Sequence, residues 1–444
     1  MTFFGAYFLP FVIVAALLSL ILPRRFRWIV LLVASVAFYS LQGLRDLCIL
    51  LVILTANIAI IASPWIRSQG VLIATISLNL GSLLLFKYVP WLYYGVFHAS
   101  GSLGFLDAGL PLGISFYLFQ LTALAVDSHR SQEKLLSIGQ AAAYTTFFPQ
   151  LVAGPILRAN DHGRQFAAPS PHAAEVPAAV MRIVWGVFKK RVVADSLSPI
   201  VSTQFANAAN LSSPEAIAGI LAFMLQIYLD FSAYADMAVG IGKLFGINLP
   251  ENFRAPYLAH SLQDFWRRWH ITLSRWLRDY LYIPLGGSRR GKARTVLNLM
   301  ITMTLGGLWH GANWTYLLWG GWHGAMLATE RVLREKRRIP GWVSTPITFL
   351  VVAIGWAFFR ADSIEQALQV LGGCFRFAEA TGAGFLLLGL IASLTVGLLV
   401  VQRLRLKDRI LALPPAIQGL IAGLLTALVY FISATESEFI YWRF

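Results

Sequence analysis

Apolar runs of near-membrane length recur along most of this chain, and they limit its possible folds more than any other feature. A helix needs about 20 apolar residues to cross a bilayer. The runs cover residues 3–22, 28–41, 47–62, 71–88, 110–126, 217–238 and 416–432. The mean hydropathy of +0.65 and the 13% of charged residues make the average position more apolar than a soluble core requires. The sequence therefore predicts a polytopic membrane protein.

Runs that approach the length of a membrane-spanning helix predict an all-α fold. Several runs are shorter than a full span, and we expect those to be tilted, re-entrant or supported by neighbouring helices. The first run has no basic residues before it, unlike a secretory signal, and we expect it to be retained. No long linker interrupts the chain. We expect one membrane domain over residues 1–444, with the catalytic region at about residues 144–325.

The net charge of +15 would indicate nucleic-acid binding in a soluble protein, but here the basic residues gather in short loops. Loops on the cytoplasmic face of membrane proteins carry such an excess of lysine and arginine. The clusters are Arg24/Arg25/Arg27, Arg289/Arg290/Lys292/Arg294, Arg331/Arg334/Lys336/Arg337/Arg338 and Arg403/Arg405/Lys407/Arg409. An even number of predicted spans separates each of the last three clusters from the next, so all three can lie on the cytoplasmic face. The same count places both chain termini on the opposite side of the membrane. We expect contact with membrane lipids and no nucleic-acid partner. Recruitment of an acidic partner or anionic lipid by the loops is the alternative.

The densest polar and aromatic stretch covers residues 264–280. As one continuous helix, it would place Trp266, Trp269 and His270 on a single face, with the arginines projecting elsewhere. Such a helix suits a cavity wall or a membrane interface. The structural alternative is an aromatic-belt helix whose arginines reach the headgroups.

A second stretch, residues 306–314, places His310 among glycines and tryptophans. Glycines permit close helix packing, or close approach of a substrate to the imidazole. An ionisable side chain at membrane depth is costly and marks a functional site by default. For a lone histidine a packed helix pair would be the simpler explanation, but His270 has a similar tryptophan-rich setting, which favours function. His323 is a weaker candidate, since it could equally support packing of its own helix.

The absence of several catalytic motifs from the sequence limits the reactions that this chain could catalyse. No nucleophile elbow, zinc-protease motif or phosphate-binding loop occurs in the sequence. Metal binding by His270, His310 and a carboxylate is conceivable, yet no ligand pair at i, i+4 spacing supports it, and we expect no metal. Burial disfavours the imidazolium and leaves the ring able to take a proton near neutral pH. A buried histidine is thus a natural general base toward an alcohol, which suffices when the electrophile is an activated thioester.

Several motifs together resemble the membrane-bound O-acyltransferases, and most closely the bacterial group that O-acetylates alginate. The motifs are residues 148–156, 226–236, 249–253, 264–287 and 306–314, with an aromatic tail at 439–444. They follow the family's order and cover most of the chain. The resemblance implies roughly 11–13 membrane helices around a central cavity open to both faces.

The resemblance also implies roles for individual residues. His310 matches the family's catalytic histidine, and His270 matches its second, upstream polar position. The further residues expected to bind substrate are Trp266, Arg267, Trp269, Trp309, Asn313 and Asp236. No tightly bound cofactor is expected, and the donor would be acetyl-coenzyme A or another acyl thioester.

The implied function is transfer of an acetyl group from a cytosolic thioester to hydroxyls of an exported polysaccharide such as alginate. The protein would lie in the inner membrane and work with a periplasmic acetyltransferase or a polysaccharide-export protein. Two alternatives remain open. One is D-alanyl transfer from a carrier protein to teichoic acid, which the identity of the donor would distinguish. The other is a non-enzymatic export channel in which the histidines line a polar pore.

Overall fold

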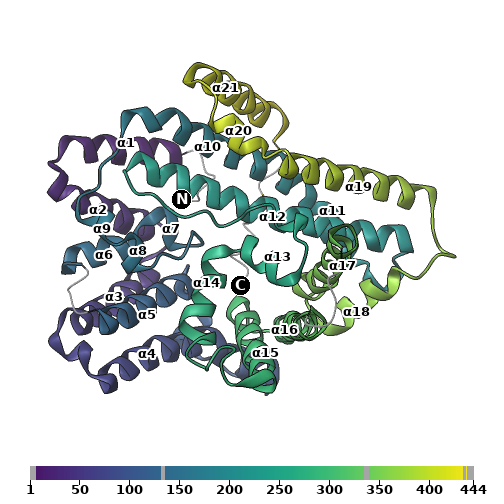
Figure 1. The fold of residues 1–444 in the computed structure, drawn as a ribbon, viewed down its shortest axis with the longest axis horizontal. Helices are drawn as coiled ribbons and strands as arrows, with labels where there is room; N and C mark the ends of the chain where they lie inside the picture. Colours follow the sequence, from purple (N-terminus) through teal and green to yellow (C-terminus); the bar gives the residue numbers. More distant parts are fainter. Residues whose placement is uncertain (1–6, 132–135, 335–339, 434–436, 438–444) are drawn as a thin grey trace. The chain divides into compact units, whose positions relative to one another are not determined.

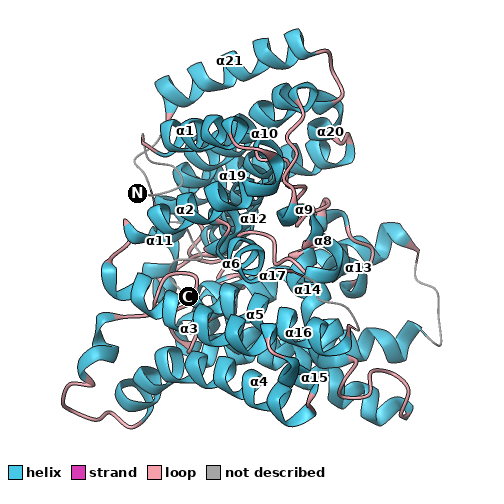
Figure 2. Ribbon diagram, turned by 90° about the vertical axis from the view of Figure 1, so that its left-hand side faces the viewer, coloured by secondary structure: helices cyan, strands magenta, loops and turns pink. Residues whose placement is uncertain are grey.

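The computed structural model describes residues 7–131, 136–334, 340–433 and 437. Every regular element in these ranges is a helix, and none is a strand (Figure 2). The predicted all-α fold is thus confirmed. Six of the described helices are long and apolar enough to cross a membrane, and the shorter helix Phe8–Ile21 is also apolar. The chain is therefore a multi-pass membrane protein. The expected count of about 11–13 spans stays a prediction.

The chain divides into two compact units, each built from two stretches of sequence. Unit 1 consists of Met1–Val184 and Tyr234–Pro250, and unit 2 of Trp185–Ala233 and Glu251–Phe444. Two of the crossings between units fall inside the helices α10 (Val176–Phe188) and α12 (Ser213–Leu244). Helical backbone therefore connects the units there, in agreement with the lack of linkers in the sequence. The expectation of one domain over residues 1–444 stays a prediction.

Unit 1 holds the N-terminal helices, coloured purple to blue in Figure 1. They are α1 (Phe8–Ile21), α2 (Arg27–Ser40), α3 (Leu44–Ala62), α4 (Gln69–Leu83), α5 (Ile114–Arg130), α6 (Ile138–Thr146), α7 (Phe148–Leu151), α8 (Ala159–His162) and α9 (Arg164–Ala167), with most of α10 and the end of α12. Buried amides connect three of them. Asn57 of α3 donates to Asn79 of α4 at 2.8 Å, and Asn79 donates to Thr122 of α5 at 3.2 Å.

Unit 2 holds the remaining helices. They are α11 (Asp195–Ala206), the start of α12, α13 (Leu262–Arg268), α14 (Ile271–Leu277), α15 (Gly291–His310), α16 (Trp314–Arg334), α17 (Gly341–Arg360), α18 (Ile364–Gly373), α19 (Gly382–Arg403), α20 (Leu406–Leu411) and α21 (Pro415–Ile432). α19 and α21 keep most of their apolar surface exposed, as helices that face lipid do.

Glycines bring α15 and α16 together, and these helices lie side by side (Figure 1). A Cβ atom added at Gly307 would lie 2.2 Å from the carbonyl oxygen of Tyr316, and one at Gly320 would lie 2.4 Å from that of Met303. Neither position has room for a side chain. The two backbones therefore approach as closely as small residues in membrane helices allow, and this contact fixes the end of α15.

Candidate active site

The helix predicted over residues 264–280 is broken in its middle, so that prediction is wrong. α13 ends at Arg268 and α14 begins at Ile271. Between them Trp269 is extended, and His270 adopts the left-handed conformation with φ 40° and ψ 55°. Such a backbone costs about 1–3 kcal/mol in a non-glycine residue and persists only where the surroundings hold it.

Tertiary hydrogen bonds cause this break. Neither proline nor glycine occurs between Leu262 and Leu277, so no local signal predicts it. Instead the preceding loop binds both helix ends: Arg254 N–H donates to the Arg268 carbonyl at 2.9 Å, and Ile271 N–H donates to the Asn252 carbonyl at 3.0 Å. Backbone groups that a continuous helix would pair internally are thus satisfied by another segment.

His310 is the last residue of α15, and Gly311 ends the helix in an extended conformation. At the other end of α15 lies a basic cluster that we call the basic loop: Arg289 and Arg290 precede the helix, and Lys292 and Arg294 lie in its first turn. All side chains of the basic loop are exposed. A helix of 20 residues is about 30 Å long, which is close to the thickness of a hydrocarbon core. The start of α15, where the basic loop lies, and His310 are therefore about a full helix length apart.

The two predicted catalytic histidines lie in one buried aromatic cluster of unit 2. Both rings contact Trp309, with centroid distances of 6.1 Å to His270 and 4.9 Å to His310. His270 also packs edge-on against Phe231 at 4.7 Å. The two histidines are only 0% and 3% exposed. The structure thus brings together residues that the sequence places on separate elements.

Trp319 of α16 connects His310 to a third histidine. Its ring centroid lies 5.2 Å from that of His310 and 4.9 Å from that of His323. His323 is fully buried, and neither ring nitrogen has a hydrogen-bond partner among the residues that the structure describes. Gly355 of α17 makes room for it, because a Cβ atom there would lie 2.8 Å from His323 Nε2. His323 therefore belongs to the same cluster.

Two of the predicted substrate-binding tryptophans also belong to the cluster. Trp269 packs on Trp356 at 4.8 Å, and Trp266 packs edge-on against His323 at 5.2 Å. Arg267 lies between them in sequence, but its side chain is exposed. Any contact of Arg267 with substrate would therefore be made at the surface of this unit, outside the buried cluster.

The last two predicted residues have structural partners. Asn313 Oδ1 accepts from Thr315 N–H at 3.1 Å and its Nδ2 donates to the Asp362 carbonyl at 3.1 Å, which helps to begin α16. Asp236 belongs to unit 1, where its carboxylate forms a buried ion pair with Arg182 at 2.8 Å. Substrate binding by either residue stays a prediction.

Sequence reasoning missed a buried ionic cluster in unit 2. Lys190 Nζ lies 2.9 Å from Asp195 and 3.1 Å from Asp230, and all three side chains are at most 1% exposed. Ser437 completes it: its hydroxyl donates to Asp195 at 2.6 Å, and its carbonyl accepts from Lys190 at 3.0 Å. Basic residues at 189–191, between apolar segments, were the available signal. Buried charges persist only when paired in this way.

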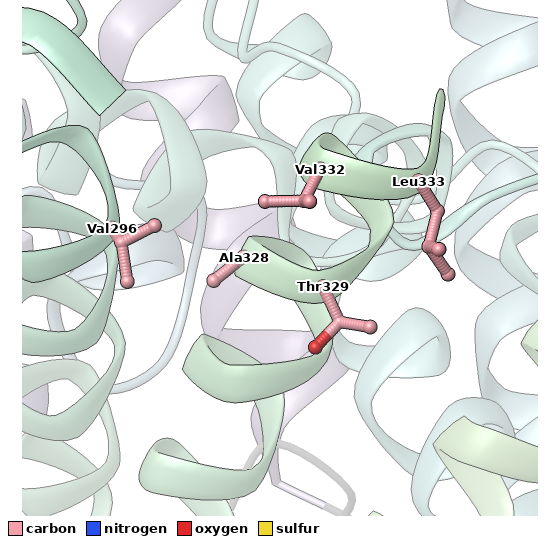
Figure 3. A pocket seen from close by; sticks show the side chains of 5 residues that line it. All are labelled: Val296, Ala328, Thr329, Val332 and Leu333. Carbon is pink, nitrogen blue, oxygen red and sulfur yellow. The ribbon is translucent and has the colours of Figure 1, made fainter. Parts of the chain in front are cut away.

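Unit 2 has an open pocket of about 320 Å³, and Figure 3 shows the side chains that line it. Its lining comes from α15 and α16 and consists of Val296, Ala328, Thr329, Val332 and Leu333. One hydroxyl among aliphatic side chains offers nothing for acid–base chemistry, so this pocket is not the candidate site. In the described part of the chain, no three His, Cys, Asp or Glu side chains gather as metal ligands would. The expectation of no metal stays a prediction.

Comparison with known proteins places the chain in a family. The model of the membrane-bound O-acyltransferase family matches residues 26–358, which include all three histidines. A probable alginate O-acetylase of Azotobacter vinelandii is 38% identical over 382 residues, covering 81% of this chain and 74% of the relative. A peptidoglycan O-acetyltransferase of Helicobacter pylori is 34% identical over 386 residues, covering 78% and 73%. A teichoic acid D-alanyltransferase of Streptococcus thermophilus is 28% identical over 244 residues, covering 51% and 59%. The chain therefore belongs to the membrane-bound O-acyltransferase family.

Proposed function

We propose that this protein moves an acetyl group from a cytosolic thioester onto hydroxyl groups of an exported cell-surface polysaccharide. One observation carries the proposal: two buried histidines share the Trp309 ring within a single aromatic cluster of an O-acyltransferase. The relatives' names, alginate O-acetylase and peptidoglycan O-acetyltransferase, support acetyl as the group transferred and a polysaccharide as the acceptor.

In the proposed reaction His310 accepts the proton of the acceptor hydroxyl. The oxygen attacks the thioester carbonyl, a C–O bond forms, the C–S bond breaks, and the imidazole returns the proton to the departing thiolate. General-base catalysis of this kind contributes about 10²-fold to 10⁴-fold in rate. His270, whose ring also contacts Trp309, is proposed to hold the thioester or the acceptor.

The donor is proposed to be acetyl-coenzyme A arriving from the cytoplasm, where thioesters are made. Its phosphates complement the positive charge of the basic loop, whose side chains are exposed. Because α15 holds His310 about 30 Å from that loop, a donor bound there needs an extended arm to bring its acyl group to the histidine. No tightly bound cofactor is part of the proposal.

The acceptor is proposed to arrive from the exported side of the inner membrane. The position of His310 supports this, since it ends the helix that begins at the basic loop, which the positive-inside bias puts on the cytoplasmic face. Alginate or a similar exopolysaccharide is the proposed acceptor. A periplasmic acetyltransferase or a polysaccharide-export protein is the proposed partner, because a polymer outside the membrane must be presented to a buried base.

The substitution His310→Ala tests the proposal. We expect it to lower both surface O-acetyl content and transfer from labelled acetyl-coenzyme A in membrane vesicles by at least about 10²-fold, while the protein accumulates normally. His172→Ala is the matched control, because His172 is exposed in unit 1 and should leave transfer unchanged. Near-normal acetylation by the His310 variant would refute the base assignment.

The same vesicles separate the alternatives. Incorporation of labelled D-alanine from its carrier protein, with no acetyl transfer, would replace the proposal by teichoic acid D-alanylation, the activity named for a more distant relative. If the wild-type protein supports polysaccharide export but no acylation, the alternative of a non-enzymatic export channel would be favoured.

The side from which the acceptor arrives has its own test. Ala312→Cys, in a background without Cys48 and Cys374, introduces a thiol two residues after His310. Ala312 is partly exposed. We expect an impermeant thiol reagent to label it from outside the cytoplasm, and labelling only from the cytoplasmic side would overturn the proposed direction.

A further inference from the structure

Asn252 makes hydrogen bonds to the two residues that directly follow His270. Its carbonyl oxygen accepts from Ile271 N–H at 3.0 Å. Its side-chain Oδ1 accepts from both the N–H and the hydroxyl of Thr272, each at 3.1 Å. Asn252 is 1% exposed and His270 is 0% exposed, so these bonds lie in the protein interior. One residue thus holds the start of α14 with its backbone and its side chain together.

The orientation of the Asn252 amide follows from its partner. Thr272 N–H can only donate, so the oxygen of the amide faces Thr272 and the nitrogen faces away. Within the described ranges, Nδ2 has no hydrogen-bond partner. The contribution of this side chain to the structure is therefore its acceptor oxygen.

We propose that Asn252 is a positioning residue: through Oδ1 it holds the left-handed turn at His270 and so fixes the direction of the imidazole. A left-handed non-glycine residue persists only where its surroundings hold it. The His270 ring lies 4.7 Å from Phe231 and 6.1 Å from Trp309, so a small backbone relaxation would move the ring against both. The inference rests on the proposed function, because it gives Asn252 a part in acyl transfer.

Substitutions at position 252 test this role, because they differ in whether they keep a hydrogen-bond acceptor oxygen at the place of Oδ1. Asn252→Ala removes Oδ1, and Asn252→Gln moves it by one carbon–carbon bond. Since misplacement by about 1 Å can cost about 10²-fold in rate, we expect both to lower kcat about 10²-fold, with KM for acetyl-coenzyme A changed less than about 3-fold. Asn252→Asp keeps an acceptor oxygen in place and replaces Nδ2 by a second oxygen, which burial favours in its protonated form, so it should recover at least about a tenth of the wild-type rate.

Two further measurements separate positioning from a general loss of stability. Asn57→Ala is the matched control, because it removes another fully buried amide, in unit 1, and should lower the melting temperature in detergent without a selective loss of kcat. In the double variant Asn252→Ala/His270→Ala, transfer should be no slower than in His270→Ala alone, since a residue that acts through His270 has nothing left to position.

Failure of the positioning role can be distinguished from failure of the proposed function. A wild-type protein that transfers no acetyl group to envelope polysaccharide refutes the function itself. A wild-type protein that is active, with Asn252→Ala and Asn252→Gln retaining more than about half of its kcat, refutes only the positioning role. Equal losses in the Ala and Asp variants, or losses that multiply with His270→Ala, refute it as well.

Discussion

Substitution of Gly307 by alanine should displace His310 and slow acyl transfer in a folded protein. The new Cβ would lie 2.2 Å from the Tyr316 carbonyl oxygen, and contacts under 3.0 Å require a shift, so α15 and α16 must move apart by at least 0.8 Å. His310 follows Gly307 by about one helical turn, and the displacement carries to its ring. Overpacking of this kind costs about 1–3 kcal/mol, and a 1 Å displacement of a catalytic group costs about 10²-fold in rate.

The assay compares Gly307→Ala with Gly321→Ala in the same helix pair. A Cβ at Gly321 would meet nothing within 4 Å, and alanine favours a helix over glycine by about 1 kcal/mol. We therefore expect the Gly321 variant to keep the wild-type rate and an equal or higher melting temperature. The Gly307 variant should melt lower and transfer acetyl from labelled acetyl-coenzyme A about 10²-fold more slowly. A wild-type rate in Gly307→Ala, or equal damage in both variants, would show that the close contact does not position His310.

Three further predictions concern His270, the basic loop and the buried ion pair of Asp236 with Arg182. His270→Ala should lower transfer in vesicles by at least about 10²-fold, the loss expected when its ring is misplaced. The double variant with His310→Ala should lose little more than His310→Ala alone, as for residues that act together; fully additive losses would make His270 a packing residue. Charge reversal of the basic loop, with topology checked independently, should raise the donor concentration for half-maximal rate, and more so at low salt; an unchanged donor dependence would restrict the loop to topology. Asp236→Asn should leave Arg182 buried without its carboxylate and cost about 3–5 kcal/mol, seen as poor accumulation and a lower melting temperature. Recovery in a double variant that also replaces Arg182 by glutamine would confirm the pair, whereas normal accumulation of the single variant would argue against it.

The apolar runs predicted the helices well, because length and hydropathy are sufficient to place a membrane helix. Run 47–62 became α3 and run 416–432 became α21, with ends that differ by a few residues. α12 extends further than its run 217–238 in both directions. Most of its apolar window is buried, and protein neighbours allow polar residues at its ends that lipid would not.

The candidate site could be predicted as a set of residues but not as a geometry. His310 was identified from its glycine and tryptophan neighbours, but the sequence did not predict that α15 ends at this residue. The break at His270 could not be predicted, because its cause lies in hydrogen bonds from Asn252 and Arg254, which precede it by more than ten residues. Helical periodicity measures only local preference, and here tertiary hydrogen bonds outweighed it.

Two kinds of buried polar group occur in unit 2. The fold pairs its buried charges, since Lys190 binds two aspartates at 2.9 and 3.1 Å. By contrast, within the described residues the ring nitrogens of His323 and the indole nitrogen of Trp319 have no hydrogen-bond partner. Each unmet group of this kind costs about 1–3 kcal/mol. Trp319 contacts both His310 and His323, so the polar substrate of the proposed acyl transfer would meet these nitrogen atoms within the same aromatic cluster.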